Sequence, residues 1–201
     1  QITHHKIIGT PNWGRSVDTL ALVAEARARG VDVTIDQYPY TASSTGINAL
    51  LPPWALEGGQ ADVVARLRDA AQRARVKKAI VESLMFDRGG GDPKNVQIAA
   101  CGWDPSLAGK NLADITRARG AEPTLDHAAE TVMWIVEQGG ASGIFHAIDE
   151  ADLESVGLGR SVCEAVDIAA RLRRREREEV GLPLSIGIAT TLLANTGAAS
   201  T

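Results

Sequence analysis

Two imidazoles and an ammonium group stand together near the start of the chain, in the run His4-His5-Lys6. Neutral imidazole is a good ligand for a divalent metal, and an ammonium group attracts anions such as carboxylates. The run follows a short β-like stretch and precedes a Gly/Pro turn and a helical pattern. Polar side chains at the carboxyl end of such a strand face the substrate in α/β folds, so this run is a candidate for metal or anion binding.

Side-chain direction limits what the two histidines can do. Neighbouring side chains on a strand point to opposite faces, so at most one of His4 and His5 faces a common interior. Lys6 lies two residues after His4 and therefore points the same way in an extended strand. Spacing alone leaves both histidines open as ligands, and it favours hydrogen-bonded or solvated imidazoles over metal ligands.

A second polar group follows the next predicted strand. Tyr38 and Tyr40 share one face of that strand, and Ser44 lies in a hydroxyl-rich run just beyond it. Phenol and hydroxyl groups beside the ammonium of Lys6 would suit a carboxylate. The alternative is that the two tyrosines form a rigid aromatic end to the strand.

The elements that must position these residues begin with a β-α-β unit. The pattern predicts strands over 2–8 and 31–36, joined by a helix over 16–29 that Gly30 ends, and the two strands are expected to be parallel. Residues 41–59 are expected to form a long ordered loop. A helix over 61–85, in one or two pieces, follows. The remaining predicted elements are strands over 96–100, 144–148 and 184–189 and helices over 112–119, 126–138 and 162–180.

Composition indicates an ordinary globular chain. Its 201 residues are 44% hydrophobic, and the net charge of −4 disfavours sequence-independent nucleic-acid binding. Cys101 and Cys163 form no disulfide framework, which favours a reducing cytoplasm. The start of the chain shows no signal pattern, and its first residue is Gln, as in a fragment or processed product. The uncharged stretch 180–201 contains Pro and Gly and is not expected to span a membrane.

Four runs in order resemble one known family: THHKIIGTPNWGRSVDTLALVAEARARGVDV, DQYPYTASSTGINALLPPWALEGG, RGGGD and AGKNLADI. They are similar to the N-acyl-D-amino-acid deacylases (D-aminoacylases) of the amidohydrolase superfamily, over about residues 1–154. The resemblance implies a metal-dependent β/α barrel that hydrolyses the amide of a small-molecule N-acyl-D-amino acid. It implies that His4 is a zinc ligand and that Lys6, Tyr38 and Ser44 contact the substrate carboxylate.

Most of that family's catalytic apparatus is missing from the sequence. Catalytic zinc needs about three protein ligands, a water and a base. The family takes these from a His-x-His strand, a Cys, a further His and a Gly-Ser-Asp motif, which this sequence lacks, and Cys101 is not in the family's ligand context. A barrel of eight strands takes about 250 residues. The chain is therefore expected to be an incomplete fragment, a partial amidohydrolase-type β/α barrel of parallel strands.

The tail departs from the deacylase pattern. The run DIAARLRRREREEVGLPLSIGIATTLLA resembles the palm of Y-family DNA polymerases, which implies that Asp149 and Glu150 bind Mg²⁺. The alternative is that both are solvated carboxylates at a strand end. The predicted organisation is an α/β chain with a partial barrel over 1–154 and a short α/β tail over 155–201. A deacylase, a polymerase palm fragment that binds nucleic acid, and an inactive fusion or remnant remain open.

Overall fold

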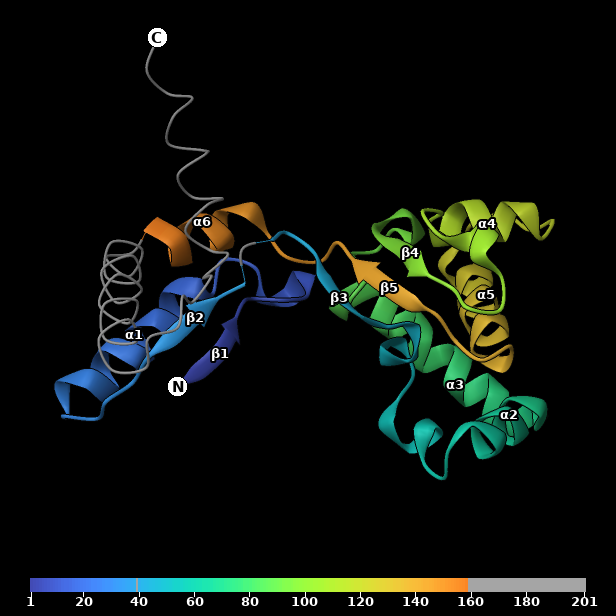
Figure 1. The fold of residues 1–201 in the computed structure, drawn as a ribbon, viewed down its shortest axis with the longest axis horizontal. Helices are drawn as coiled ribbons and strands as arrows, with labels where there is room; N and C mark the ends of the chain where they lie inside the picture. Colours follow the sequence, from blue (N-terminus) through green and yellow to red (C-terminus); the bar gives the residue numbers. More distant parts are fainter. Residues whose placement is uncertain (39, 159–201) are drawn as a thin grey trace, which may run out of the picture.

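The computed structural model describes residues 1–38 and 40–158, which form two parts side by side (Figure 1). The smaller part contains β1 (Ile2–His5), α1 (Ser16–Ala28), β2 (Ile35–Gln37) and α6 (Glu150–Leu158). The larger part contains the described elements that lie between β2 and α6 in the chain, from β3 to β5. The helix predicted over 162–180 and the strand predicted over 184–189 lie outside the described residues.

The predicted β-α-β unit is present in the smaller part. β1 and β2 pair in parallel, and α1 connects them. Gly30 ends α1 with a φ of 83°, and the N–H of Val31 donates to the carbonyl of Ala26 at 3.1 Å. This left-handed glycine with a backward hydrogen bond is a common helix stop. Both strands are shorter than predicted: β1 ends at His5 rather than at residue 8, and β2 begins at Ile35 rather than at residue 31.

A three-stranded antiparallel sheet organises the larger part. Its strands are β3 (Ser43–Gly46), β4 (Val96–Ala100) and β5 (Ser142–Phe145), in the order β3-β5-β4. The expectation of parallel strands is wrong here. The loop expected over 41–59 instead contains β3 and two short 3-10 helices, η2 (Ile47–Leu50) and η3 (Pro53–Leu56). β3 has no alternation of apolar and polar residues, so the period-two signal of a strand is missing.

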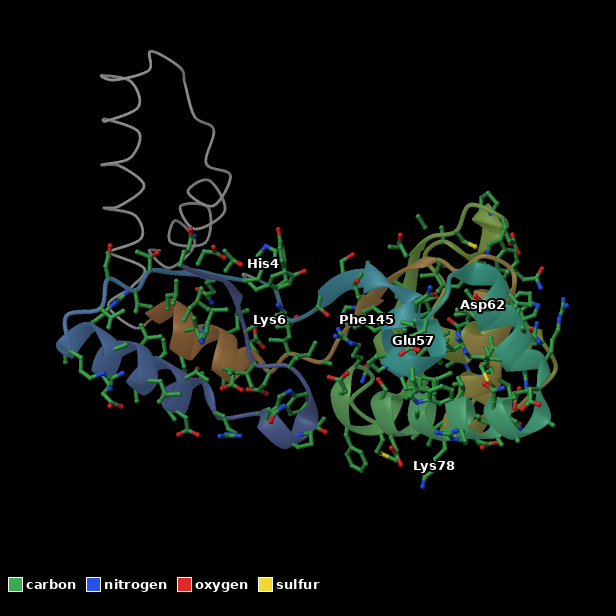
Figure 2. All side chains as sticks on the ribbon, turned by 90° about the horizontal axis from the view of Figure 1, so that it is seen from below. His4, Lys6, Glu57, Asp62, Lys78 and Phe145 are labelled. Carbon is green, nitrogen blue, oxygen red and sulfur yellow. The ribbon has the colours of Figure 1, made fainter. Side chains whose placement is uncertain are left out.

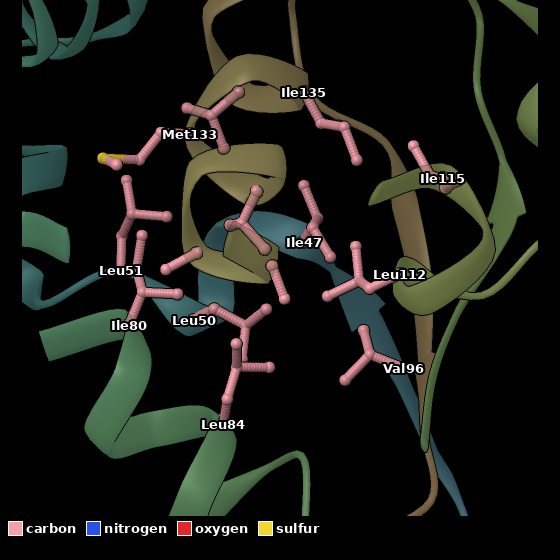
Figure 3. Packing of buried hydrophobic residues seen from close by; sticks show 14 of the residues in the cluster. Ile47, Leu50, Leu51, Ile80, Leu84, Val96, Leu112, Ile115, Met133 and Ile135 are labelled. Atoms are coloured by element: carbon pink, nitrogen blue, oxygen red, sulfur yellow. The ribbon is translucent and has the colours of Figure 1, made fainter. Parts of the chain in front are cut away.

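Helices pack against this sheet around one apolar core. They are α2 (Gln60–Arg68), α3 (Ala70–Glu82), α4 (Leu112–Ala118) and α5 (Leu125–Glu137). Asp69 separates α2 from α3 and caps α3 by accepting a 2.8 Å hydrogen bond from the Gln72 N–H. Figure 3 shows the packing of Ile47, Ile80 and Met133, which are fully buried. The helical structure predicted over 61–85 is present, and it consists of two helices followed by a π-helical turn, η4 (Ser83–Asp87).

The two parts meet where η1 (Thr10–Asn12) contacts η4. Gly9 has a φ of 88°, and a Cβ atom there would lie 2.7 Å from the carbonyl oxygen of Phe86. Its N–H donates to the carbonyl of Ala147 at 3.0 Å, and the N–H of His146 donates to the carbonyl of Asn95 at 2.8 Å. Glycine is required at this junction because the backbones approach too closely for a side chain.

The described residues form an α/β structure with a parallel sheet of two strands, and a barrel is not confirmed. The predicted boundary at residue 154 lies inside α6, and residues 159–201 of the predicted tail lie outside the described chain. None of the helices in the described part has both the length and the apolar character that a membrane crossing requires.

Candidate functional site

Tyr38, at the end of β2, is the centre of a cluster of the predicted site residues. The ammonium of Lys6 lies over its ring, 4.8 Å from the centroid, and the His4 ring meets it edge to face at 5.5 Å. Its hydroxyl oxygen accepts a 3.2 Å hydrogen bond from the backbone N–H of Ser44, and the ring of Tyr40 lies 5.9 Å away. Residues from three separate segments of the chain therefore converge on one phenol.

The cluster is open on one side. His4 and Ser44 are exposed, whereas Lys6 and Tyr38 are half-buried. Figure 2 shows His4 and Lys6 on the smaller part of the chain. Lys6 donates a 3.1 Å hydrogen bond to the carbonyl of His4, and no carboxylate of the described residues lies within ion-pair distance of its ammonium. An anion that approached from solvent would meet this ammonium and the hydroxyl groups beside it.

A small cavity of about 10 Å³ lies on the buried side of the cluster. Lys6, Gln37, Tyr38 and Leu153 are among its lining residues. A space of that size holds one water molecule at most. A ligand of amino-acid size would therefore bind on the exposed side, where the ammonium and the phenol edge are accessible.

His4 departs from ordinary strand geometry. Its φ is 56°, and among the described residues other than glycine it is the one with a positive φ. Ile2 pairs with Ile35 and His5 pairs with Gln37, so β1 has one residue more than β2 between these two pairs. The N–H of His4 donates to a carboxylate oxygen of Asp36 on β2. Such a bulge changes the direction of a side chain.

His5 has a different environment from His4. Its Nε2 lies 3.1 Å from the hydroxyl oxygen of Thr19 on α1, and that hydroxyl donates to the carbonyl of Ser16 at 2.9 Å. The imidazole is therefore the donor to Thr19. Burial, and next the positive charge of Lys6, lower the pKa of His5. A neutral His5 joins β1 to α1, which is a structural role.

Asp149 and Glu150 lie at the start of α6 rather than at a strand end, because β5 stops at Phe145. Asp149 accepts hydrogen bonds from the N–H groups of Ala151 at 3.0 Å and Asp152 at 3.2 Å. This is the geometry of a helix N-cap, which gives its carboxylate a structural partner. The Mg²⁺ interpretation of the pair stays without support.

Asp152 is the buried carboxylate of this segment, and the sequence patterns did not single it out. It accepts hydrogen bonds from the N–H of Gly14 at 2.7 Å and of Ser16 at 3.0 Å, at the start of α1. Burial alone would raise its pKa, but these hydrogen bonds outweigh that effect and lower the pKa of Asp152. Asp152 therefore fixes α6 to α1 and holds the β-α-β unit that carries His4 and Lys6.

The described residues bring together fewer metal donors than a zinc ion requires. A catalytic zinc takes about three protein ligands. Within residues 1–38 and 40–158, no three His, Cys, Asp or Glu side chains lie close enough to hold one ion together. His4 offers one exposed imidazole, and the described residues by themselves do not make a zinc site.

Comparison with known proteins identifies one short region of strong similarity. A segment of 44 residues is 54% identical to N-acyl-D-glutamate deacylase and 57% identical over the same length to D-aminoacylase, both of Alcaligenes xylosoxydans xylosoxydans. These alignments cover 22% of the chain and 9% of each relative, so the chain aligns with about a tenth of those proteins. This segment is homologous to the two deacylases. No family model matches the chain.

Solved structures of an N-acyl-D-glutamate deacylase and of a D-aminoacylase also align with this chain. N-acyl-D-glutamate deacylase of Bordetella bronchiseptica, complexed with zinc and a phosphonate inhibitor, aligns with 78% of the chain at 26% identity and a TM-score of 0.46. A D-aminoacylase, described as defining a subset of amidohydrolases, aligns with 77% at 30% identity and a TM-score of 0.44. Each alignment covers 23% of the solved chain. These TM-scores do not establish a shared fold, and no relative is a polymerase among those found.

Proposed function

We propose that this chain carries the substrate-carboxylate site of a metal-dependent deacylase of N-acyl-D-amino acids. The observation that carries the proposal is the convergence of Lys6, His4 and the Ser44 backbone on the ring of Tyr38. An N-acyl-D-amino acid carries a free α-carboxylate, and an ammonium beside phenol and serine hydroxyl groups suits that anion. The homologous segment shared with two deacylases supports the same substrate class.

In this proposal the four residues have distinct roles. Lys6 supplies the charge, and the half-buried ring of Tyr38 fixes the ammonium by a cation–π contact. Ser44 would donate its exposed hydroxyl to the second carboxylate oxygen. The imidazole of His4 would be one ligand of a zinc ion, and the other ligands would have to come from outside the described residues.

Ligand binding tests the proposal with N-acetyl-D-alanine and its neutral carboxamide as probes. Calorimetry is expected to detect binding of the carboxylate and at least fivefold weaker binding of the carboxamide, because one exposed charge pair contributes about 1 kcal/mol. Lys6→Met should weaken carboxylate binding by a similar factor. Lys78→Met is the matched control, since Lys78 is a surface lysine on the larger part of the chain (Figure 2). Equal affinity for the two probes would contradict the proposal.

A further inference from the structure

We infer that Asp36 is a positioning residue that sets the direction of the His4 side chain. The inference rests on the proposed function, because it concerns the residue that would bind the metal beside the carboxylate site. Asp36 is the middle residue of β2, and one of its carboxylate oxygens accepts the backbone N–H of His4. Its other oxygen accepts a 2.9 Å hydrogen bond from the side-chain amide of Gln1.

The backbone of His4 gives the first reason for this role. A positive φ is unfavourable for a residue with a Cβ atom, because the side chain crowds the backbone oxygen. Such a conformation persists only where the surrounding structure imposes it, and it is found most often at functional sites. The carboxylate of Asp36 supplies an acceptor for the N–H of His4, which lies within the irregular stretch of the β1–β2 pairing.

The contacts of the neighbouring side chains give the second reason. His5 is directed toward α1, where it meets Thr19, while His4 and Lys6 both contact Tyr38. His4 and Lys6 therefore share one face, as in a regular strand, although β1 carries an extra residue and His4 has a positive φ, and we infer that the contact with Asp36 holds His4 in this arrangement. Loss of the Asp36 acceptor would allow His4 to return to an extended conformation. Its imidazole would then leave the edge of the Tyr38 ring.

Nuclear magnetic resonance without any ligand tests this role. In the intact chain, a scalar coupling through the hydrogen bond should join the His4 amide nitrogen to the Asp36 carboxylate carbon. Asp36→Leu should speed exchange of the His4 amide at least tenfold and shift the His4 ring signals, while Asp36→Asn, which keeps an acceptor oxygen, should restore both. Asp32→Leu, at an exposed carboxylate four residues earlier, is the control and should change neither.

The outcomes separate this inference from the proposed function. The positioning role would be overturned if Asp36→Leu left the His4 amide exchange and ring signals unchanged. It would also be overturned if a folded Asp36→Asn chain showed the same fast exchange and shifted ring signals as Asp36→Leu. If Asp36→Leu does not fold, the coupling in the unsubstituted chain decides, and its absence overturns the role. Binding of N-acetyl-D-alanine is measured separately. A confirmed coupling without any carboxylate binding would refute the proposed function and leave the positioning role of Asp36 intact.

Discussion

Replacement of Asp152 by alanine should loosen the smaller part of the chain without unfolding the larger one. The substitution removes two charge-assisted hydrogen bonds, at 2.7 and 3.0 Å, and leaves the N–H groups of Gly14 and Ser16 without their acceptor. A hydrogen bond to a charged group contributes about 1.5–3 kcal/mol, and loss of a helix cap costs about 1–2 kcal/mol. Water can enter the vacated space and accept hydrogen bonds from these N–H groups. We therefore expect the free energy of unfolding of the smaller part to fall by about 3 kcal/mol.

Amide hydrogen exchange resolves this effect residue by residue. A cost of about 3 kcal/mol corresponds to about a hundredfold faster exchange in α1, for example at the buried Val23, because 1.4 kcal/mol is a factor of ten. Ile98, in β4 of the larger part, should change less than threefold. Asp152→Asn keeps one acceptor and should give about half the free-energy cost. Glu150→Ala, at an exposed position on the same helix, should change neither amide.

Two results would refute this reasoning about Asp152. One is exchange at Val23 that Asp152→Ala leaves unchanged, because the carboxylate would then not stabilise α1. The other is an equal increase at Val23 and Ile98, because the two parts would then unfold together. The lowered pKa of Asp152 also fixes a pH dependence: its contribution should persist above pH about 4 and disappear as pH falls through the folded-state pKa.

Four further substitutions test other contacts. Because the pKa of His5 is lowered in the folded chain, the unfolded chain binds this proton at higher pH as the pH falls. Urea denaturation should therefore show a loss of stability below pH about 6.5, and His5→Gln should make that loss smaller. Glu130→Gln should cost about 0.5–1 kcal/mol at pH 7, because its ion pairs with two cations are partly exposed, and the cost should vanish in acid. Gly14→Ala should lower the free energy of unfolding by about 1–2 kcal/mol, because Gly14 has a positive φ. Gly9→Ala should lower it by about 1–3 kcal/mol more, because its Cβ atom would also meet the Phe86 carbonyl, and equal losses for the two variants would contradict this contact.

The sequence predicted the residues of the candidate site better than their geometry. Parallel strands joined by a helix bring their carboxyl ends to one edge, so Lys6 and Tyr38 could be expected to lie together. Ser44 also lies there, but its observed contact is made by its backbone N–H and belongs to a strand that the pattern did not show. The roles of these residues stay a prediction.

The conformation of His4 could not be read from local sequence. Its positive φ depends on a hydrogen bond to Asp36, which is 32 residues away, and on a bulge that arises only when β1 and β2 pair. A useful signal was nevertheless present, because Asp36 and Tyr38 share one face of the second predicted strand. A carboxylate on the same face as the site tyrosine is a candidate partner for the neighbouring strand.

In the larger part, the sequence predicted an element well only where its apolar residues recur with a clear period. The helices around Leu112 and Val132 have apolar residues at helical spacing, and both were predicted within a residue or two of their ends. β3 consists of Ser43, Ser44, Thr45 and Gly46, so its existence depends on pairing with β5, about a hundred residues later. Non-local pairing therefore decided where the parallel arrangement ended and the antiparallel sheet began.

The most direct test of the carboxylate site is a titration with N-acetyl-D-alanine of the chain labelled with ¹³C in its lysine and tyrosine side chains. We expect a saturable shift of the Lys6 Cε signal together with the Tyr38 ring signals, and none at Lys78. The carboxamide probe should leave the same signals in place at equal concentrations. Unchanged Lys6 and Tyr38 signals at saturating carboxylate, or equal shifts at Lys6 and Lys78, would contradict the assignment of this cluster to substrate binding.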